Sequence, residues 1–190
     1  LYLFFWGITF ITDSGLKRTE FGNFNDWNKI FNKEIQPTLI IQGSSRAWVQ
    51  YDTKILDSLL NVDSYNMGMD GSPFDVQYLR FRACVSNGII PKIIIQNVDW
   101  DLLTRNDPPY QSYQFMPYLY HPDFKKDILK YRLLKKKDVQ FSFLKYSGNP
   151  KAIITGVSEF LGLKQYKSDK YKGFKGSNDH WDNNNFNIRK

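Results

Sequence analysis

Two short runs of large apolar residues limit what this chain can fold into. They are residues 38–42 (TLIIQ) and 92–98 (KIIIQNV), and a third strand is expected between them at 62–66. Runs this short and this uniformly apolar are typical of strands buried on both faces of a parallel sheet. The segments between the strands are long enough for the helical crossovers that parallel pairing requires. Residues 38–98 should therefore alternate strand, helix, strand, helix, strand.

Helix signals fill the two intervening segments. Asp52 is a good N-cap for a helix in which residues 55, 56, 59 and 60 share one apolar face. Ser72 before Pro73 predicts a second helix, with the serine as cap and the proline at the first helical position, and Gly88 predicts its end. Right-handed crossovers then predict an α/β fold, a three-layer flavodoxin-like parallel sheet.

The rest of the chain divides into segments of different character. Residues 13–37 are predicted to connect to the 38–104 core, with Asn25 or Asp26 capping a short helix and Pro37 ending it. Residues 105–164 form a loop and a helical insertion after the third strand, with helices from Pro122, over about 138–146 and over 150–163. The aromatic stretch within 99–120 is interpreted either as a lid packed on the core or as a cleft lining. Residues 165–190 are polar with no expected strand, so we expect the fold to be incomplete at the C-terminus.

Residues 1–12 (LYLFFWGITFIT) are strongly apolar and carry no charge. Twelve residues are too few to cross a bilayer, which needs roughly 20. We interpret them as the outer part of a membrane or signal anchor, because Asp13, Ser14 and Gly15 end the apolar run abruptly. The alternative is an N-terminal helix or strand of the core.

Composition excludes several classes of function. The net charge of +7 invites a nucleic-acid partner, but the basic residues form no periodic stripe and no known binding motif, so none is expected. The densest basic cluster, within 125–137, is predicted to be a solvated face. Cys84 is the single cysteine, which excludes an intrachain disulfide. No cysteine–histidine cluster has zinc spacing, so no metal or other cofactor is expected.

The turn after the first strand is the main candidate for chemistry. Gly43 allows the chain to turn sharply, and Ser44 and Ser45 follow it at the carboxyl end of the strand, where open α/β sheets place their ligands. A serine hydroxyl there is positioned for acyl chemistry. The alternative is a polar turn that only caps the next segment.

Motifs at the ends of the three expected strands resemble those of one enzyme family. They are Gly43-Ser44-Ser45-Arg46-Ala47, the stretch 65–71 (YNMGMDG) and the stretch 93–99 (IIIQNVD). Over about residues 36–104 the chain resembles the SGNH (GDSL-type) hydrolases. It looks most like their membrane-anchored cell-envelope branch, which has a Gly-Ser-Ser-Arg-Ala motif. Ser44 replaces the aspartate of the wider family, and Gln96 and Val98 depart from its pattern around Asn97.

The resemblance implies a role for each matching residue. Ser45 occupies the position of the nucleophile, and its amide with that of Gly71 would stabilise the oxyanion. Asn97 would add a side-chain donor, and Ser44 and Arg46 complete the binding set.

The general base is the least defined part of the expected site. The chain has two histidines, His121 and His180. His121 is interpreted as a helix cap or surface residue. His180 is the candidate base, although Ser177 stands where the family's Asp-x-x-His motif has its aspartate. The alternative is a catalytic pair beyond Lys190, in which case residues 1–190 alone would be close to inert.

The expected function is that of a serine esterase or O-acyl (acetyl) transferase-like protein. The resemblance implies an ester-bearing glycan or lipid-linked substrate, a membrane tether, and a location on the extracytoplasmic side of a bacterial cell envelope. Two alternatives stay open: a non-catalytic envelope binding or assembly protein that keeps the fold, and a flavodoxin-like binder of a small ligand.

Overall fold

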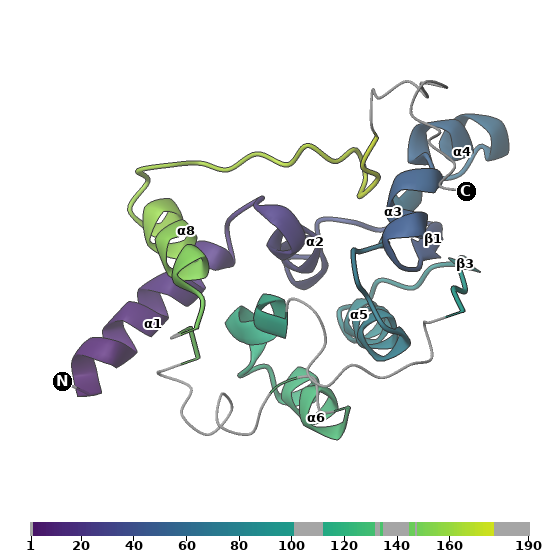
Figure 1. Ribbon diagram of the computed structural model, residues 1–190. Coiled ribbons are helices and arrows are strands. Elements are labelled where there is room, and N and C mark those ends of the chain that lie inside the picture. The colour runs from purple at the N-terminus through teal and green to yellow at the C-terminus, as the bar shows by residue number, and fades with distance from the viewer. Residues whose placement is uncertain (1, 101–111, 132–133, 135–144, 147, 177–190) are drawn as a thin grey trace, which may run out of the picture.

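The computed structural model of this chain describes residues 2–100, 112–131, 134, 145–146 and 148–176 (Figure 1). Within them the chain forms an α/β fold around three parallel strands. The strands are β1 (Leu39–Gln42), β2 (Ser64–Asn66) and β3 (Ile93–Gln96). The helices are α1 (Tyr2–Leu16), α2 (Gly22–Phe31), α3 (Ser45–Gln50), α4 (Thr53–Leu60), α5 (Phe74–Ser86), the 3₁₀ helix η1 (Ser112–Tyr118), α6 (Pro122–Lys130) and α8 (Pro150–Phe160).

The first strand lies at the centre of the sheet, whose order is β2-β1-β3. Leu39 pairs with Ser64 on one side and with Ile93 on the other. Helices α3 and α4 connect β1 to β2, and α5 connects β2 to β3, so the expected alternation of strands and helices is confirmed. Because all three strands are parallel, the loops that follow them emerge at one edge of the sheet.

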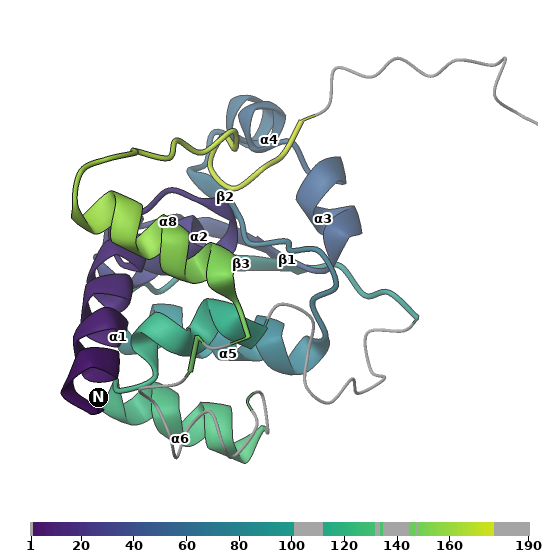
Figure 2. The ribbon, with the colours of Figure 1, turned by 60° about the vertical axis from the view of Figure 1, so that its left-hand side comes forward.

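Both faces of β1 are buried, which explains its uniform apolar sequence. The side chain of Ile40 packs with residues of α2 and α5 in the larger core. Those of Leu39 and Ile41 pack on the opposite face with Ala47 of α3 and Leu56 of α4. The sheet is thus the middle of three layers, with α3 and α4 on one face and α5 on the other (Figure 2).

Residues expected to be a connector belong to the core. Trp27 of α2 is fully buried, and its Nε1 donates a hydrogen bond of 2.8 Å to Oε1 of Gln114. Asp26 lies inside α2 instead of capping it, and no side chain caps the helix start at Phe21. The aromatic side chain of Phe115 in η1 packs edge-on against Trp27, with ring centroids 5.6 Å apart. This part of the aromatic stretch is therefore packed on the core.

Of the two helix starts predicted in the core, that of α4 is confirmed and that of α5 differs in detail. The carboxylate of Asp52 caps α4 as expected and accepts a bond of 2.8 Å from the amide of Lys54. Residues 55, 56, 59 and 60 share one face of α4 as expected, but only Leu56 of these packs on the core. Ile55, Leu59 and Leu60 are exposed. The extended backbone of Pro73 makes it the N-cap of α5, in place of Ser72. Gly88 follows α5 with a φ of 79°, as its predicted role requires.

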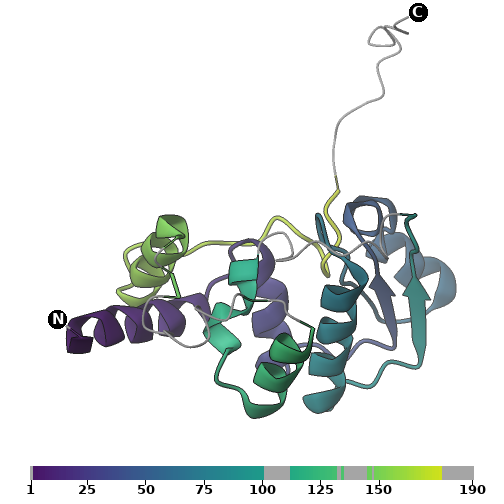
Figure 3. The ribbon, with the colours of Figure 1, turned by 60° about the horizontal axis from the view of Figure 1, so that its bottom comes forward.

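The apolar run is helical from Tyr2 onward, and α1 continues past Asp13, Ser14 and Gly15 to Leu16. The charge of Asp13 is neutralised by Lys145, whose Nζ lies 2.6 Å away. Gly15 permits close packing on α8, because a Cβ there would lie 1.8 Å from the carbonyl oxygen of Gly156. Figure 3 shows α1 and α8 crossing at the end of the molecule farthest from the sheet.

After α8, an extended segment crosses the molecule to the side of α3 and α4 (Figure 1). There it reaches the outer edge of β2. The amide of Asn66 donates to the carbonyl of Lys172 at 2.8 Å, and the amide of Lys175 donates to the carbonyl of Trp48 at 3.2 Å. On the other side of the sheet, Ile93 and Ile94 of β3 are nearly half exposed. The described residues contain no strand beside β3, and the expectation of further strands stays a prediction. Most of the helix expected at 138–146 lies outside the described residues.

Candidate functional site at the carboxyl edge of the sheet

Hydrogen bonds join the three loops that leave the carboxyl ends of the strands. The amide of Met69, after β2, donates to the carbonyl of Gly43, after β1, at 3.3 Å. The amide of Asn97, after β3, donates to the carbonyl of Gln42 at 2.8 Å. The sequence motifs at 43–47, 65–71 and 93–99 are therefore neighbours in space.

Two glycines make this close approach of the loops feasible. A Cβ on Gly43 would lie 2.5 Å from the Cβ of Ala47 and 2.8 Å from that of Asn97. A Cβ on Gly68 would lie 2.4 Å from the backbone nitrogen of Trp48. Such contacts are too short for any side chain, so both positions require glycine to hold α3 against the neighbouring loops.

The carboxylate of Asp99 is the centre of the polar contacts at this edge. Its side chain is 5% exposed, and it accepts a hydrogen bond from the hydroxyl of Ser44. It also accepts a bond of 3.0 Å from Nη1 of Arg46 and one of 3.2 Å from Nδ2 of Asn97. Three residues expected at the site are thus tied to one buried acid.

Ser45 differs from Ser44 in this respect. It is the first residue of α3, half-buried, and its hydroxyl has no hydrogen-bond partner in the described part of the chain. The hydroxyl of Ser44, in contrast, donates to Asp99 and accepts a bond of 3.3 Å from the amide of Arg46 as the N-cap of α3. Of the two serines, only Ser45 therefore has a hydroxyl that no described group engages.

The loop after β2 carries the expected oxyanion donor. Gly71 has a φ of 59°, a conformation that glycine adopts without strain. Its amide makes no backbone hydrogen bond to any described residue. The amide of Ser45 is also free of an intrahelical partner, because it lies in the first turn of α3. The side chain of Asn97 is already engaged, since it donates to Asp99 and accepts from the hydroxyl of Tyr51 at 3.4 Å.

Among the described residues, no histidine lies at this edge of the sheet. His121 precedes α6 and packs against the ring of Phe31, with centroids 5.4 Å apart. It lines a small cavity with Ser86 and Asn87, at the end of α5 that leads toward the amino end of β3. His121 therefore lies at the wrong end of the sheet to act on Ser45, and it makes no side-chain cap bond. His180 lies outside the described residues.

Other reactive groups of the described chain lie elsewhere. Cys84 is fully buried, and burial raises the pKa of its thiol to about 12, which makes it a poor nucleophile. No group of three or more potential metal ligands occurs among the described residues.

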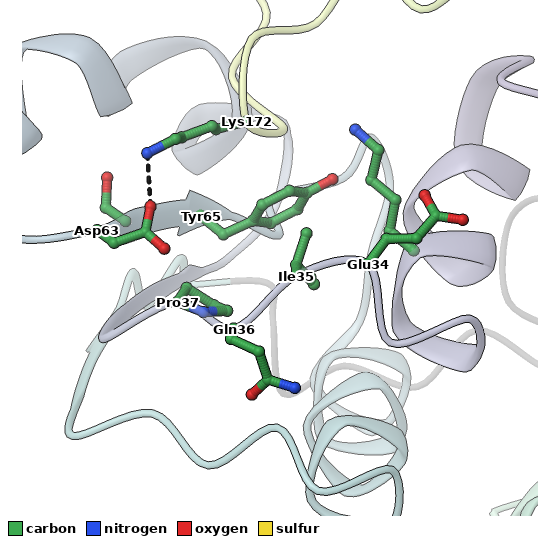
Figure 4. A pocket seen from close by; sticks show the side chains of 9 residues that line it. Glu34, Ile35, Gln36, Pro37, Asp63, Tyr65 and Lys172 are labelled. Atoms are coloured by element: carbon green, nitrogen blue, oxygen red, sulfur yellow. Dashed lines mark hydrogen bonds and ion pairs between the residues drawn. The ribbon is translucent and has the colours of Figure 1, made fainter.

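The pocket in Figure 4, of about 270 Å³, is lined by residues such as Pro37, Asp63 and Lys172. It lies at the amino ends of β1 and β2, and the site at Ser45 lies at their carboxyl ends.

Sequence reasoning missed the part played by Asp99. Its position after the third strand was evident, but nothing local indicated that its carboxylate would bind a serine 55 residues earlier. The detectable signal was an acid at the end of a parallel strand, next to a central strand that ends in two serines.

Comparison with protein-family models, curated proteins and solved structures finds no match to this chain.

Proposed function

We propose that this chain carries the nucleophile of a serine esterase or O-acyl (acetyl) transferase-like protein of the SGNH (GDSL) type. The substrate would be an ester-bearing glycan or a lipid-linked ester of the bacterial cell envelope. The observation that carries the proposal is the contrast between the free hydroxyl of Ser45 and the engaged hydroxyl of Ser44 at the edge of a parallel sheet. The flavodoxin-like arrangement of the sheet is compatible with this family.

In the proposed reaction, the Oγ of Ser45 attacks the ester carbonyl and loses its proton to a base. The amides of Ser45 and Gly71 receive the negative charge that develops on the carbonyl oxygen, and each such donor is worth about 3–4 kcal/mol in the transition state. Collapse of the intermediate releases the alcohol, which takes a proton, and leaves the acyl group on Ser45. Water or a sugar hydroxyl then accepts the acyl group and restores the serine.

The base in this scheme is His180 or a histidine beyond Lys190. The carboxylate of Asp99 serves as a positioning group, because its hydrogen bonds link Ser44, in the turn after β1, to Asn97, in the loop after β3. By holding Ser44 as the cap of α3, it determines where Ser45 stands.

A second function is a non-catalytic binding or assembly role with the same fold. It is favoured by the engagement of Asn97, which removes one expected oxyanion donor. In that case the bonds among Ser44, Arg46 and Asp99 would serve only to stabilise the turn.

The proposal places the chain at a membrane through its N-terminal segment. Leu3, Phe4 and Phe10 of α1 are 65–85% exposed, and they lie on the uncharged part of the helix. Lys17 and Arg18 follow near its end, as is typical of segments at an anionic lipid surface. No helix in the described residues is both long enough and apolar enough to span a bilayer.

Labelling with a fluorophosphonate probe tests the proposed function. The wild-type chain and the Ser44→Ala variant should be labelled, and the Ser45→Ala variant should not. Far-ultraviolet circular dichroism of all three proteins controls for folding. Labelling that persists in folded Ser45→Ala would remove Ser45 as the nucleophile. Absence of labelling would favour the binding role only in the full-length protein, because residues 1–190 alone would be close to inert if the base lies beyond them.

A further inference from the structure

A cavity of about 250 Å³ lies beside Trp48, and six separate segments form its walls. Its aromatic side chains are Phe21, Phe24, Trp48 and Tyr113, which come from the start of α2, from α3 and from η1. The other walls come from the start of α8, the loop after β2 and the segment 169–175. Ligand pockets usually measure about 300–1,000 Å³, so this cavity suits one small unit of a ligand.

The cavity adjoins the candidate nucleophile. Trp48 lies three residues after Ser45 on α3, and residues so spaced are neighbours on a helix surface. Asp70, another lining residue, immediately precedes Gly71. The close approach of Gly68 to the backbone of Trp48 keeps this loop and α3 in contact. A ligand in the cavity would therefore lie next to the turn that carries Ser45.

Lysine side chains are held over the aromatic walls. Nζ of Lys175 lies 4.8 Å from the ring centroid of Trp48, and Nζ of Lys151 lies 5.0 Å from that of Phe21. These cation–π contacts position the ammonium groups and leave their N–H donors available. A third lysine, Lys170, also lies over Trp48, but it is committed to the buried carboxylate of Asp26 at 2.7 Å.

The positive charge of Lys151 and Lys175 is only weakly compensated. Lys151 has no ion pair with any described residue. Lys175 lies 3.9 Å from Asp169, but both side chains are exposed, and such pairs contribute little. The carboxylates of Asp70 and Asp169 at the rim can accept hydrogen bonds from hydroxyl groups. Aromatic walls, two available cations and rim acceptors together suit a ring with apolar C–H faces, hydroxyl groups and a negative charge.

We propose that this cavity binds one acidic sugar unit, whose charge is a carboxylate or a phosphate, of the glycan that carries the ester. The inference rests on the proposed function only for the ester, since binding itself does not require Ser45. A nucleic-acid strand fits less well, because proteins that bind single strands use grooves that follow about 4–16 nucleotides per domain.

Binding to the folded Ser45→Ala chain tests the inference without turnover. Isothermal titration would use a short uronic-acid oligosaccharide, a sugar phosphate, the neutral oligosaccharide of the same length and a single-stranded oligonucleotide. The variants are the Lys151→Gln/Lys175→Gln double mutant and Trp48→Leu. Lys92→Gln is the control, an exposed lysine before β3, at the opposite edge of the sheet.

We expect an acidic sugar to bind at least about tenfold more tightly than its neutral counterpart, which corresponds to roughly 1.4 kcal/mol. The double mutant and Trp48→Leu should each lose this preference, and Lys92→Gln should keep it. Tighter binding of the uronate or of the phosphate would identify the anionic group. Equal binding of the acidic and neutral sugars, an unchanged affinity in the double mutant, or tighter binding of the oligonucleotide would overturn the inference. Because every arm uses Ser45→Ala, failure of Ser45 labelling would not affect the result.

Discussion

The hydrogen bond between Ser44 and Asp99 should be measurable as a coupling free energy. Replacing either residue with alanine removes the bond, and the double mutant shows how much of the two losses is shared. Asp99 is almost fully buried, so its carboxylate cannot regain these bonds from water when Ser44 is removed. The cycle therefore tests whether Asp99 fixes the turn that presents Ser45.

The structure sets the expected magnitudes. A hydrogen bond to a charged group contributes about 1.5–3 kcal/mol, and we expect a coupling of this size between Ser44 and Asp99. The bond from Arg46 adds little, because its side chain is 59% exposed and exposed pairs contribute about 0.2–1 kcal/mol. With the bond from Asn97 included, Asp99→Ala should lower the free energy of unfolding by about 2–4 kcal/mol in total.

Urea denaturation at pH 7, followed by circular dichroism, measures these values. Arg46→Gln is the matched control and should lower the free energy of unfolding by no more than about 1 kcal/mol. A coupling below about 0.5 kcal/mol, the limit within which independent sites add, would refute the positioning role of Asp99.

Three further predictions concern packing and charge. Gly68→Ala should lower the free energy of unfolding by about 1–3 kcal/mol or more, because the added Cβ would meet the backbone of α3. The same clash should weaken probe labelling. Urea denaturation measures the first effect and fluorophosphonate labelling the second. Gly15→Ala should destabilise the contact of α1 with α8 in thermal melts, whereas Gly7→Ala, with open space around it, should stabilise α1 by about 0.5–1 kcal/mol. Burial acts to raise the pKa of the Asp26 carboxyl, but the charges of Lys170 and Arg80 outweigh burial and hold it below the ordinary 3.8. This carboxylate therefore stabilises the fold above about pH 4, and the stabilisation is lost as the pH falls through its folded pKa. Asp26→Asn should lower the free energy of unfolding by about 3–5 kcal/mol at pH 7. In urea titrations below about pH 4, the difference between Asp26→Asn and wild type should shrink.

The sequence predicted those parts of the fold that depend on local pattern. The apolar run of β1 indicated a strand covered on both faces, and it is central in the sheet. Asp52 and Gly88 were recognisable because capping is a contact within a few residues of the chain. Element order then followed from the length of the connections.

Contacts between distant residues were beyond local reasoning. Nothing near Asp26 indicates that its partner is Lys170, 144 residues later, so a capping role was the natural but wrong prediction. Likewise, Gly15 was interpreted only as part of the end of the apolar run. Its reason for being glycine is the close contact of α1 with Gly156, which lies in α8, far along the chain. At the site, the motif Gly43-Ser44-Ser45 could be recognised from the sequence. The hydrogen bond from Ser44 to Asp99 could not be predicted, because it depends on the pairing of β1 with β3.

The most direct test of the central claim locates the fluorophosphonate adduct on the wild-type chain. Trypsin releases residues 34–46 as one peptide that contains both Ser44 and Ser45, and tandem mass spectrometry distinguishes the two positions. We predict an adduct on the Oγ of Ser45 and an unmodified Ser44. An adduct on Ser44, or on a serine away from this peptide, would contradict the account.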